Sequence, residues 1–295
     1  MNGILLIDKP AGWTSMDVCA KMRGALREKR VGHSGTLDPM ATGLLVVLLG
    51  RATRAAQYAE AQTKTYEAAM RFGLVTDTQD VTGTALETHP ADVTDAALEA
   101  VLEQFRGEIA QIPPMYSALK VNGQKLYDLA RKGREVEREP RPVRIDALML
   151  TGRTPEGDAL LHVECSKGTY VRTLCHDIGA ALGCGGCMSA LRRTRCGAFS
   201  VEDAHSLDEV LAAAAAGAAE QLLLPVETVF AGTPDAVLTA AQEKVVRNGG
   251  RFSSSLPDGA YLLRAPDGAF LALGAVRGGV MRSEKSFYEV ETQKP

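Results

Sequence analysis

Hydrophobic and polar residues follow different periods along the chain, and each period predicts a different element. Residues 3–7 form a short apolar run ending at Asp8, which is typical of a strand that enters a turn. Apolar side chains then recur at helical spacing after Ser15, which predicts a helix with Ser15 as its N-cap. Residues 44–49 are continuously apolar between two glycines, so we expect a strand that is buried on both faces.

The middle of the chain mixes helical and strand periods. Residues 92–108 predict an acidic amphipathic helix, and residues 161–165 alternate as a half-buried strand does. A helical period resumes over 171–182. Ser206 and Glu209 form a capping-box pattern that opens an Ala-rich helix.

The last part of the chain has the pattern of a small all-β module. Residues 224–234 resemble a linker, and the apolar runs at 261–264 and 270–273 flank a Pro-Asp-Gly turn, which predicts a hairpin. We therefore expect a mixed α/β (α+β) domain over residues 1–231 and a small β domain over residues 232–295.

Length and composition restrict the class of protein. The chain has 295 residues, 45% of them hydrophobic and 23% charged, which are the values of a globular protein. No uninterrupted apolar stretch reaches the ~18–20 residues that a membrane-spanning helix needs. The first residues have no basic region, apolar core or cleavage site, so no signal peptide is predicted and a cytoplasmic protein is expected.

The charge is distributed unevenly. The formal net charge is -3, which at first argues against a nucleic-acid partner. Counted by segment, however, the net charge is +4 over 1–72, -7 over 73–112, +5 over 113–200 and -5 over 201–295. Because local fields guide a polyanion more than total charge does, an RNA partner stays open, as does an ordinary solvated surface.

One segment is both basic and poor in apolar residues. Residues 120–144 contain eight basic and four acidic residues, together with two prolines. This composition predicts an exposed arm rather than part of the core.

Six cysteines allow a metal hypothesis. A C-x-x-C pattern at 184–187 lies between Cys175 and Cys196, and the four residues form a loose set that a zinc ion could use. The spacing on either side fits no compact zinc ribbon. Reduced thiols in a cytosolic protein are therefore favoured, with a zinc-binding scaffold as the alternative.

Candidate chemistry is concentrated in three places. The chain has no Walker loop and no dinucleotide, zinc-hydrolase or nucleophile-elbow motif. The Gly-punctuated loop 32–43 carries Asp38 before a proline, although a lone Asp-Pro is more often a turn residue. Arg172 becomes informative only if it faces Asp38, because a buried arginine would keep the aspartate ionised. Tyr66 is by itself more often a core aromatic than a catalyst.

A family resemblance rests on several motifs in order along the chain. The segment 33–45, HSGTLDPMATGLL, resembles the catalytic motif of the TruB family, the bacterial tRNA pseudouridine-55 synthases. The other matching segments cover about the first 230 residues; they are 6–10 (LIDKP), 64–66 (KTY), 71–80 (RFGLVTDTQD), 113–120 (PPMYSALK), 167–173 (KGTYVRT) and 191–194 (LRRT). The tail is similar, more weakly, to the PUA-type RNA-binding module.

The resemblance implies a fold and a reaction. It implies the pseudouridine-synthase fold, with a central mixed and largely antiparallel sheet, flanking helices and a PUA-like C-terminal β domain. The implied reaction isomerises a uridine to pseudouridine at position 55 in the tRNA T-loop, after the base is flipped out. An isomerisation requires no redox cofactor, ATP or metal, so no cofactor and no metal site are expected.

The resemblance also assigns roles to residues. Asp38 matches the family nucleophile, Arg172 the arginine that pairs with it, and Tyr66 the tyrosine that stacks on the target base and serves in proton transfer. His33, Tyr170 and Leu191 match residues that line the pocket. Whether Asp38 attacks the ribose or the reaction uses another intermediate is left open by the sequence.

The RNA contacts expected from the resemblance are basic. In the family the segment 120–144 is a mobile thumb that folds over the RNA, and its cations are expected to lie along phosphates. The residues expected to contact RNA are Lys9, Lys64, Lys120, Arg131 and Lys132. The expected partner is the T-arm stem-loop of tRNA, bound by a monomer without a membrane or a nucleotide cofactor.

Two other functions remain as alternatives. One is a guide-RNA-dependent relative with the same catalytic core, although the chain has no long basic extension. The other is a tRNA-folding, RNA-binding protein whose isomerase activity is secondary. Retention of Asp38, Tyr66 and Arg172 argues against lost activity but does not exclude a folding role.

Overall fold

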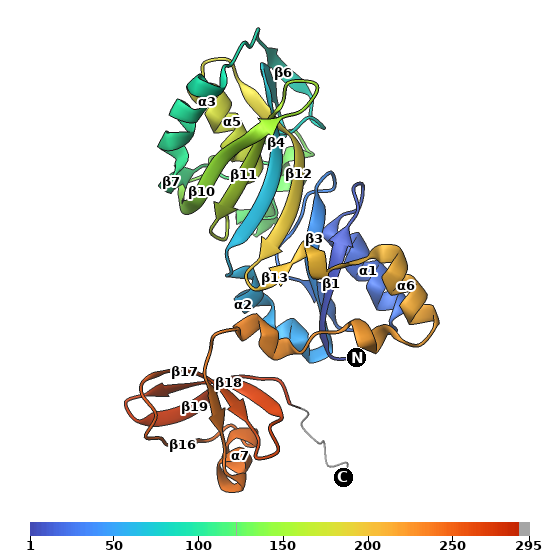
Figure 1. Cartoon of the computed structure of the whole chain (residues 1–295), viewed down its shortest axis with the longest axis vertical. Coiled ribbons are helices and arrows are strands. Elements are labelled where there is room, and N and C mark those ends of the chain that lie inside the picture. Colours follow the sequence, from blue (N-terminus) through green and yellow to red (C-terminus); the bar gives the residue numbers. More distant parts are fainter. Residues whose placement is uncertain (122, 289–295) are drawn as a thin grey trace.

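The structure is a computed structural model that describes residues 1–121 and 123–288. Figure 1 shows an elongated molecule with a large sheet and its helices toward one end and a small sheet at the other. The large sheet has ten strands, in the order β14-β1-β3-β12-β4-β11-β10-β7, with β13 beside β12 and β2 beside β3. Among the described strand pairs of this sheet, only β1–β14 and β3–β12 are parallel.

The larger part of the protein, which precedes the C-terminal module, contains both strands and α-helices. The strands of the ten-stranded sheet are β1 (Gly3–Lys9), β2 (Val31–His33), β3 (Thr42–Leu49), β4 (Lys64–Phe72), β7 (Gly107–Gln111), β10 (Arg141–Arg153), β11 (Ala159–Cys165), β12 (Gly186–Cys196), β13 (Phe199–Ser200) and β14 (His205–Ser206). Two small hairpins consist of β5 (Leu74–Thr76) with β6 (Ala85–Thr88), and β8 (Lys120–Val121) with β9 (Gln124–Lys125). The α-helices are α1 (Ser15–Ala25), α2 (Ala56–Glu60), α3 (Asp95–Leu102), α4 (Leu126–Ala130), α5 (Val171–Ala181) and α6 (Leu207–Ala215).

Helices cover the sheet in two groups. The helices α1 and α6 pack against β1 and β3, where strand β3 is buried along almost its whole length, as its continuous apolar run predicts. The helices α3 and α5 pack against β4, β10, β11 and β12 over a second core (Figure 1). The two halves of the sheet meet where β3 and β12 pair, and this pairing covers only two residues of each strand.

This short pairing positions the loop that carries Asp38. Strand β3 pairs with β12 only at Thr42 and Gly43, at its very start, so the two strands separate beyond this point. The loop that precedes Thr42 therefore enters the sheet at the junction of its two halves. Side chains from both halves can reach Asp38 there.

The C-terminal module is a five-stranded sheet in the order β15-β17-β18-β19-β16. Its elements are β15 (Asp235–Val237), α7 (Ala240–Arg247), β16 (Arg251–Ser253), β17 (Gly259–Arg264), β18 (Phe270–Arg277) and β19 (Val280–Ser286). The predicted hairpin is present as β17 and β18. Residues 289–295 of the expected C-terminal domain lie outside the described residues.

Four local expectations differ from the structure. Thr14, not Ser15, caps α1, because its hydroxyl accepts the hydrogen bond from the Asp17 amide and Asp17 completes a capping box. The helix expected over 92–108 is α3 and a short 3-10 turn, because Gly107 already begins β7. The linker expected over 224–234 instead contains a 3-10 turn whose Val226, Val229 and Phe230 are buried, so it packs between the two parts.

The fourth difference concerns the basic arm. Leu126 and Leu129 are buried on the short helix α4, so the arm has a small apolar anchor of its own. The residues 131–135 after this helix are exposed, as the composition predicted. Residue 122 of the arm lies outside the described residues.

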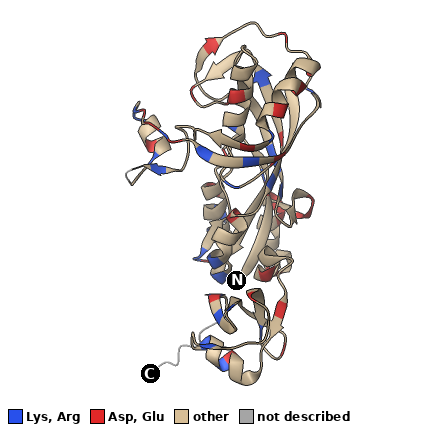
Figure 2. Cartoon of the chain, turned by 90° about the vertical axis from the view of Figure 1, so that its left-hand side faces the viewer, with Lys and Arg blue, Asp and Glu red and all other residues tan. Residues whose placement is uncertain are grey.

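Figure 2 shows cationic and anionic residues intermingled over the molecule rather than separated into two hemispheres.

Candidate active site

The loop before β3 is fixed by hydrogen bonds on both sides of Asp38. The Ser15 hydroxyl accepts from the Leu37 amide at 2.9 Å, and the Pro39 carbonyl accepts from the Gly12 amide at 2.8 Å. The amide of Ala41 donates to the Asp38 carbonyl at 3.1 Å. The backbone around Asp38 is therefore held in place, while 30% of its side chain remains exposed and open to a ligand.

Arg172 binds the Asp38 carboxylate with two of its nitrogens. Its Nε lies 2.8 Å from Asp38 Oδ2, and its Nη2 donates to Asp38 Oδ1 at 3.2 Å. The guanidinium also donates to the carbonyls of Thr78 and Tyr116, both at 2.9 Å. The Arg172 side chain is only 6% exposed and its guanidinium has four acceptors, so it has little freedom to turn away.

A second carboxylate lies behind Arg172. Asp80 Oδ2 is 3.7 Å from Arg172 Nη1, and the Asp80 side chain is also buried. Its Oδ1 accepts from the amide of Thr82 and the hydroxyl of Thr78, both at 2.9 Å. Asp80 thus supplies part of the charge that balances a buried guanidinium.

The electrostatics of Asp38 combine opposing effects. Burial raises the pKa of the Asp38 carboxyl above its usual range, and the charge of Asp80 adds to the rise. The charge and hydrogen bonds of Arg172 act in the opposite direction, as does the charge of Lys9. A poorly hydrated carboxylate that is kept ionised by a fixed cation has the character of a nucleophile or base.

Tyr66 and Leu191 lie on the apolar side of the same site. Both residues belong to the core that also contains Leu37 and Val171, next to Asp38 and Arg172 in sequence. Tyr66 is 8% exposed, and burial raises the pKa of its phenol to about 12. The phenol is therefore neutral at physiological pH and lies in a surface of low polarity.

Two further predicted residues border the site. The backbone of Tyr170 is fixed before α5 by Gln111, whose amide oxygen accepts from the Tyr170 amide at 3.0 Å. Burial also raises the pKa of the Tyr170 phenol. His33 ends β2; burial lowers the pKa of its imidazole, and its buried Nδ1 has no hydrogen-bond partner among the described residues. An unpartnered imidazole nitrogen in this position can bind a ligand.

The predicted RNA-binding lysines fall into two groups. Lys9 is fully buried, and its ammonium donates to the carbonyls of Pro10 at 2.9 Å and Trp13 at 2.7 Å. Burial lowers the pKa of Lys9 to about 8. Lys64 is also buried and donates to backbone carbonyls.

In this structure the ammonium groups of Lys9 and Lys64 donate to backbone carbonyls and are buried from solvent. Their contact with RNA stays a prediction. A lysine ammonium can saturate three acceptors, and the turns after β1 and before β4 provide them. The thumb cations Lys120, Arg131 and Lys132 are exposed, as expected for a surface that binds a polyanion.

Sequence reasoning missed several residues that build the site. Asp80 lies inside a quoted motif but was given no role, because its position beside Arg172 depends on the turn between β5 and β6. The sequence predicts Ser15 as a helix cap, whereas its hydroxyl binds the backbone of Leu37 in the Asp38 loop. Arg193 is the third such residue; it is buried on β12, and the polar run 192–195 around it carries no sequence signal of that burial.

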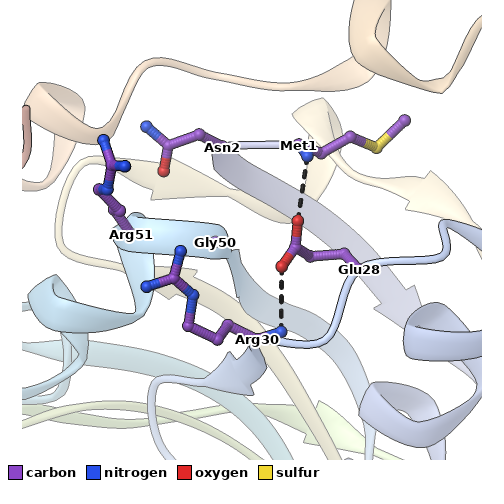
Figure 3. Close-up of a pocket in the computed structure, with 6 residues that line it drawn as sticks. All are labelled: Met1, Asn2, Glu28, Arg30, Gly50 and Arg51. Carbon is purple, nitrogen blue, oxygen red and sulfur yellow. Dashed lines mark hydrogen bonds and ion pairs between the residues drawn. The ribbon is translucent and has the colours of Figure 1, made fainter. Parts of the chain in front are cut away.

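A separate cavity of about 320 Å³ lies away from Asp38, at the other end of β3. Figure 3 shows its lining, in which the Glu28 carboxylate accepts from the Met1 amine and the Arg30 amide, each at 3.0 Å. Gly50 begins the turn after β3, eight residues along the chain from Thr42 and the Asp38 loop. This cavity is not part of the candidate active site.

The cysteines show no arrangement for a metal. All six are buried free thiols. Among residues 1–121 and 123–288, no group of three or more His, Cys, Asp or Glu side chains is placed to hold an ion. No helix in the same range is long and apolar enough to cross a membrane.

Comparison with known proteins gives relatives over nearly the whole chain. A curated tRNA pseudouridine synthase B of Thermobifida fusca is 45% identical over 287 residues, covering 94% of this chain and 96% of the relative. The protein of the same name from Aquifex aeolicus is 40% identical over 287 residues, with 97% and 99% covered.

Solved structures give the same fold. The chain is similar to one in a Cbf5-Nop10-Gar1 complex, with a TM-score of 0.75, 27% identity and coverage of 97% of this chain and 85% of that one. A chain in an H/ACA RNP bound to a substrate RNA containing 2'-deoxyuridine matches with a TM-score of 0.74 and 25% identity, at the same coverage. These likenesses confirm the expected fold class of a mixed sheet with helices and a small C-terminal β domain.

Family models match the two consecutive parts of the larger region. Residues 23–171 match the N-terminal domain of the TruB family pseudouridylate synthases, and residues 172–231 match the tRNA pseudouridylate synthase B C-terminal domain. The first segment contains Asp38 and Tyr66, and the second contains Arg172 and Leu191. This chain belongs to the TruB family of pseudouridylate synthases.

Proposed function

We propose that this protein isomerises uridine to pseudouridine at position 55 in the T-loop of tRNA, with Asp38 as the nucleophile. The observation that carries the proposal is the two-nitrogen contact of buried Arg172 with a partly exposed Asp38 carboxylate. Full-length relatives named tRNA pseudouridine synthase B support the substrate.

The reaction breaks the bond between the ribose and N1 of uracil and forms a bond to C5. A carboxylate that can add and leave suits this exchange, because it forms a reversible bond while the base turns. Attack by Asp38 on C1′ and an alternative route through another intermediate both satisfy this requirement. In either route the proton on C5 must leave, and N1 regains one, so no net oxidation or hydrolysis occurs.

We assign the binding of the flipped base to the neighbours of Asp38. Tyr66 offers an aromatic face for stacking, and Leu191 closes the apolar side. Tyr170 precedes α5, and the charge of Asp38 contributes to raising the pKa of its phenol. We also assign an RNA contact to His33. Tyr66 is also the group we assign to proton transfer, since its phenol lies in a poorly solvated site.

The remaining parts of the chain provide the RNA-binding surface. We assign residues 1–231 to the catalytic domain, with the thumb over 120–144, and residues 232–295 to a PUA-like RNA-binding domain. We assign phosphate contacts on the T-arm to the thumb cations, and their exposure to solvent supports this role. The protein is proposed to act as a cytoplasmic monomer without a cofactor.

The substitution Asp38→Asn tests the proposal. It should abolish the release of tritium from tRNA labelled at C5 of uridine, because an amide cannot act as the nucleophile, while tRNA affinity stays within about twofold. The exposed Asp208→Asn serves as the matched control and should keep full activity. Substantial tritium release by Asp38→Asn would refute the assignment, and mapping of the product by mass spectrometry tests the position.

A guide-RNA-dependent enzyme is the second candidate, favoured by the structural likeness to the chain in the Cbf5-Nop10-Gar1 complex. The two candidates differ in what they need. A stand-alone enzyme forms pseudouridine in a protein-free tRNA transcript with no other RNA or protein present. Failure on that transcript, with activity restored by a guide RNA, would favour the second candidate.

A further inference from the structure

Arg193 occupies the point where the catalytic loop, β4 and β12 meet. It lies on β12, where its backbone pairs with Gly43 on one side and with Tyr66 on the other. The residue is only 1% exposed, and it is among the largest fully buried side chains of the described residues. This register places one side chain between the loop of the nucleophile and the strand of the aromatic residue.

The Arg193 guanidinium joins the two ends of the catalytic loop. Its Nε donates to the Leu44 carbonyl at 2.7 Å, and its Nη2 donates to the Gly35 carbonyl at 3.2 Å. Gly35 precedes Asp38 and Leu44 follows it, so the Arg193 guanidinium holds the two ends of the loop together. We call this arrangement a clamp. Space is tight at the Gly43 end, where a Cβ would lie 2.3 Å from the Arg193 carbonyl oxygen; at Gly35 a Cβ would be in ordinary contact with Arg193 Nη1, at 3.6 Å.

The charge of Arg193 has no local counter-ion. Among the described residues, no carboxylate lies within ion-pair distance of its guanidinium, although such a buried cation is costly. Its charge instead lowers the pKa values of Lys9, Lys64 and His33, after the larger effect of burial on each. Because burying this cation without an ion-pair partner costs folding free energy, we expect Arg193 to do more than fill space in the core.

The Tyr66 phenol is the acidic group that feels this charge. Burial raises the pKa of Tyr66, and the charge of Arg193, which pairs with Tyr66 across β12 and β4, opposes the rise. The other titratable neighbours, Cys165 and Cys196, add to the rise. Arg193 is thus the group that stabilises negative charge on this phenol.

We propose that Arg193 is a positioning residue, which clamps the two ends of the catalytic loop and presents its positive charge to the Tyr66 phenol. The inference rests on the proposed function, in which Asp38 attacks and Tyr66 transfers a proton. Its first consequence is a fixed carboxylate, and its second is a phenol that releases its proton more readily.

Two variants separate the clamp from the charge. Arg193→Met removes both, whereas Arg193→Lys keeps the charge but cannot reach both carbonyls in the same way. Each is prepared with 3-fluorotyrosine, and the Tyr66 fluorine resonance is assigned by its loss in Tyr66→Phe. We expect the Tyr66 titration to move to higher pH in Arg193→Met and to stay close to that of the parent protein in Arg193→Lys.

Kinetics on a tRNA T-arm stem-loop test the clamp. We expect kcat to fall about 100-fold in Arg193→Met and about tenfold in Arg193→Lys, with KM within about twofold, because a displaced loop misplaces Asp38 after binding. The neighbouring Arg192→Met is the matched control; this arginine is 42% exposed and pairs with Asp8. It should leave the Tyr66 titration unchanged.

The outcomes are distinguishable. An unchanged Tyr66 titration in Arg193→Met would overturn the electrostatic part, and unchanged kcat in Arg193→Lys would overturn the clamp. If Arg193→Met does not fold, the kcat of Arg193→Lys still decides the clamp, and a Tyr66 titration moved upward in that variant would refute the charge effect. A parent protein that forms no pseudouridine would refute the proposed function, whereas the fluorine titration would still test the contact between Arg193 and Tyr66.

Discussion

Replacing Arg172 by methionine tests the central ion pair of the site. Methionine keeps much of the side-chain volume but removes the fork that binds Asp38 and the carbonyls of Thr78 and Tyr116. Removal of one partner from a buried pair costs about 3–5 kcal/mol. Because 30% of the Asp38 side chain is exposed, we expect the lower end of that range. We expect the same loss in the transition state, where the ionised Asp38 is needed, and about 3 kcal/mol lowers kcat/KM about 160-fold.

The pH dependence of the reaction rate should also change, in a direction that the structure defines. Arg172 opposes the burial that raises the pKa of Asp38, so its removal should raise that pKa further. Since the reaction needs the carboxylate, the acidic limb of the rate profile should move to higher pH in Arg172→Met, and Arg172→Lys should restore part of the shift.

Single-turnover tritium release between pH 5 and 9 measures both effects. Arg153→Met, which removes a surface pair with Asp95, is the control and should change neither rate nor profile. An Arg172→Met enzyme with the parent rate, or with an unmoved acidic limb, would show that Arg172 does not keep Asp38 ionised.

Two more predictions concern the thumb and the catalytic loop. Replacing Arg131 and Lys132 by glutamine should weaken tRNA binding and reduce the slope of log K against log salt by up to about 1.8, as two lost phosphate contacts require; an unaltered slope in a filter-binding titration would contradict this role. Gly43→Ala should destabilise the fold by at least about 2 kcal/mol in urea unfolding, because φ is +96° and the new Cβ would meet the Arg193 carbonyl at 2.3 Å. Gly12→Ala, with φ of +83° and no atom within 4 Å, isolates the backbone strain, and equal losses in the two variants would exclude the clash.

Local chemistry and ordered motifs made much of this protein predictable from its sequence. The apolar run before Gly50 specified the buried strand β3, and Ser206 with Glu209 specified the capped start of α6. These features depend on residues that are close together in the sequence, so the sequence alone predicts them. The motif around Asp38 pointed to the family, which the relatives and family models confirm.

Segmental charge was also informative, whereas total charge was not. The net charge of -3 argues weakly against RNA, yet the basic segments are those that contain Asp38, Tyr66, Arg172 and the thumb. The structure adds that sequence counts do not reveal which cations face solvent. Lys9 is buried against carbonyls, while Arg131 is exposed.

Only the tertiary structure decided how the distant residues meet. Asp38 and Arg172 are 134 positions apart, and the ion pair forms because α5 begins beside the loop that precedes β3. The same holds for Asp80 behind Arg172 and for Arg193, whose burial depends on the two-residue pairing of β3 with β12. The burial of a side chain, its pKa and the direction in which an arginine guanidinium points all depend on the residues packed around it. A sequence names the groups that can react, but the fold sets their solvation and their mutual distances.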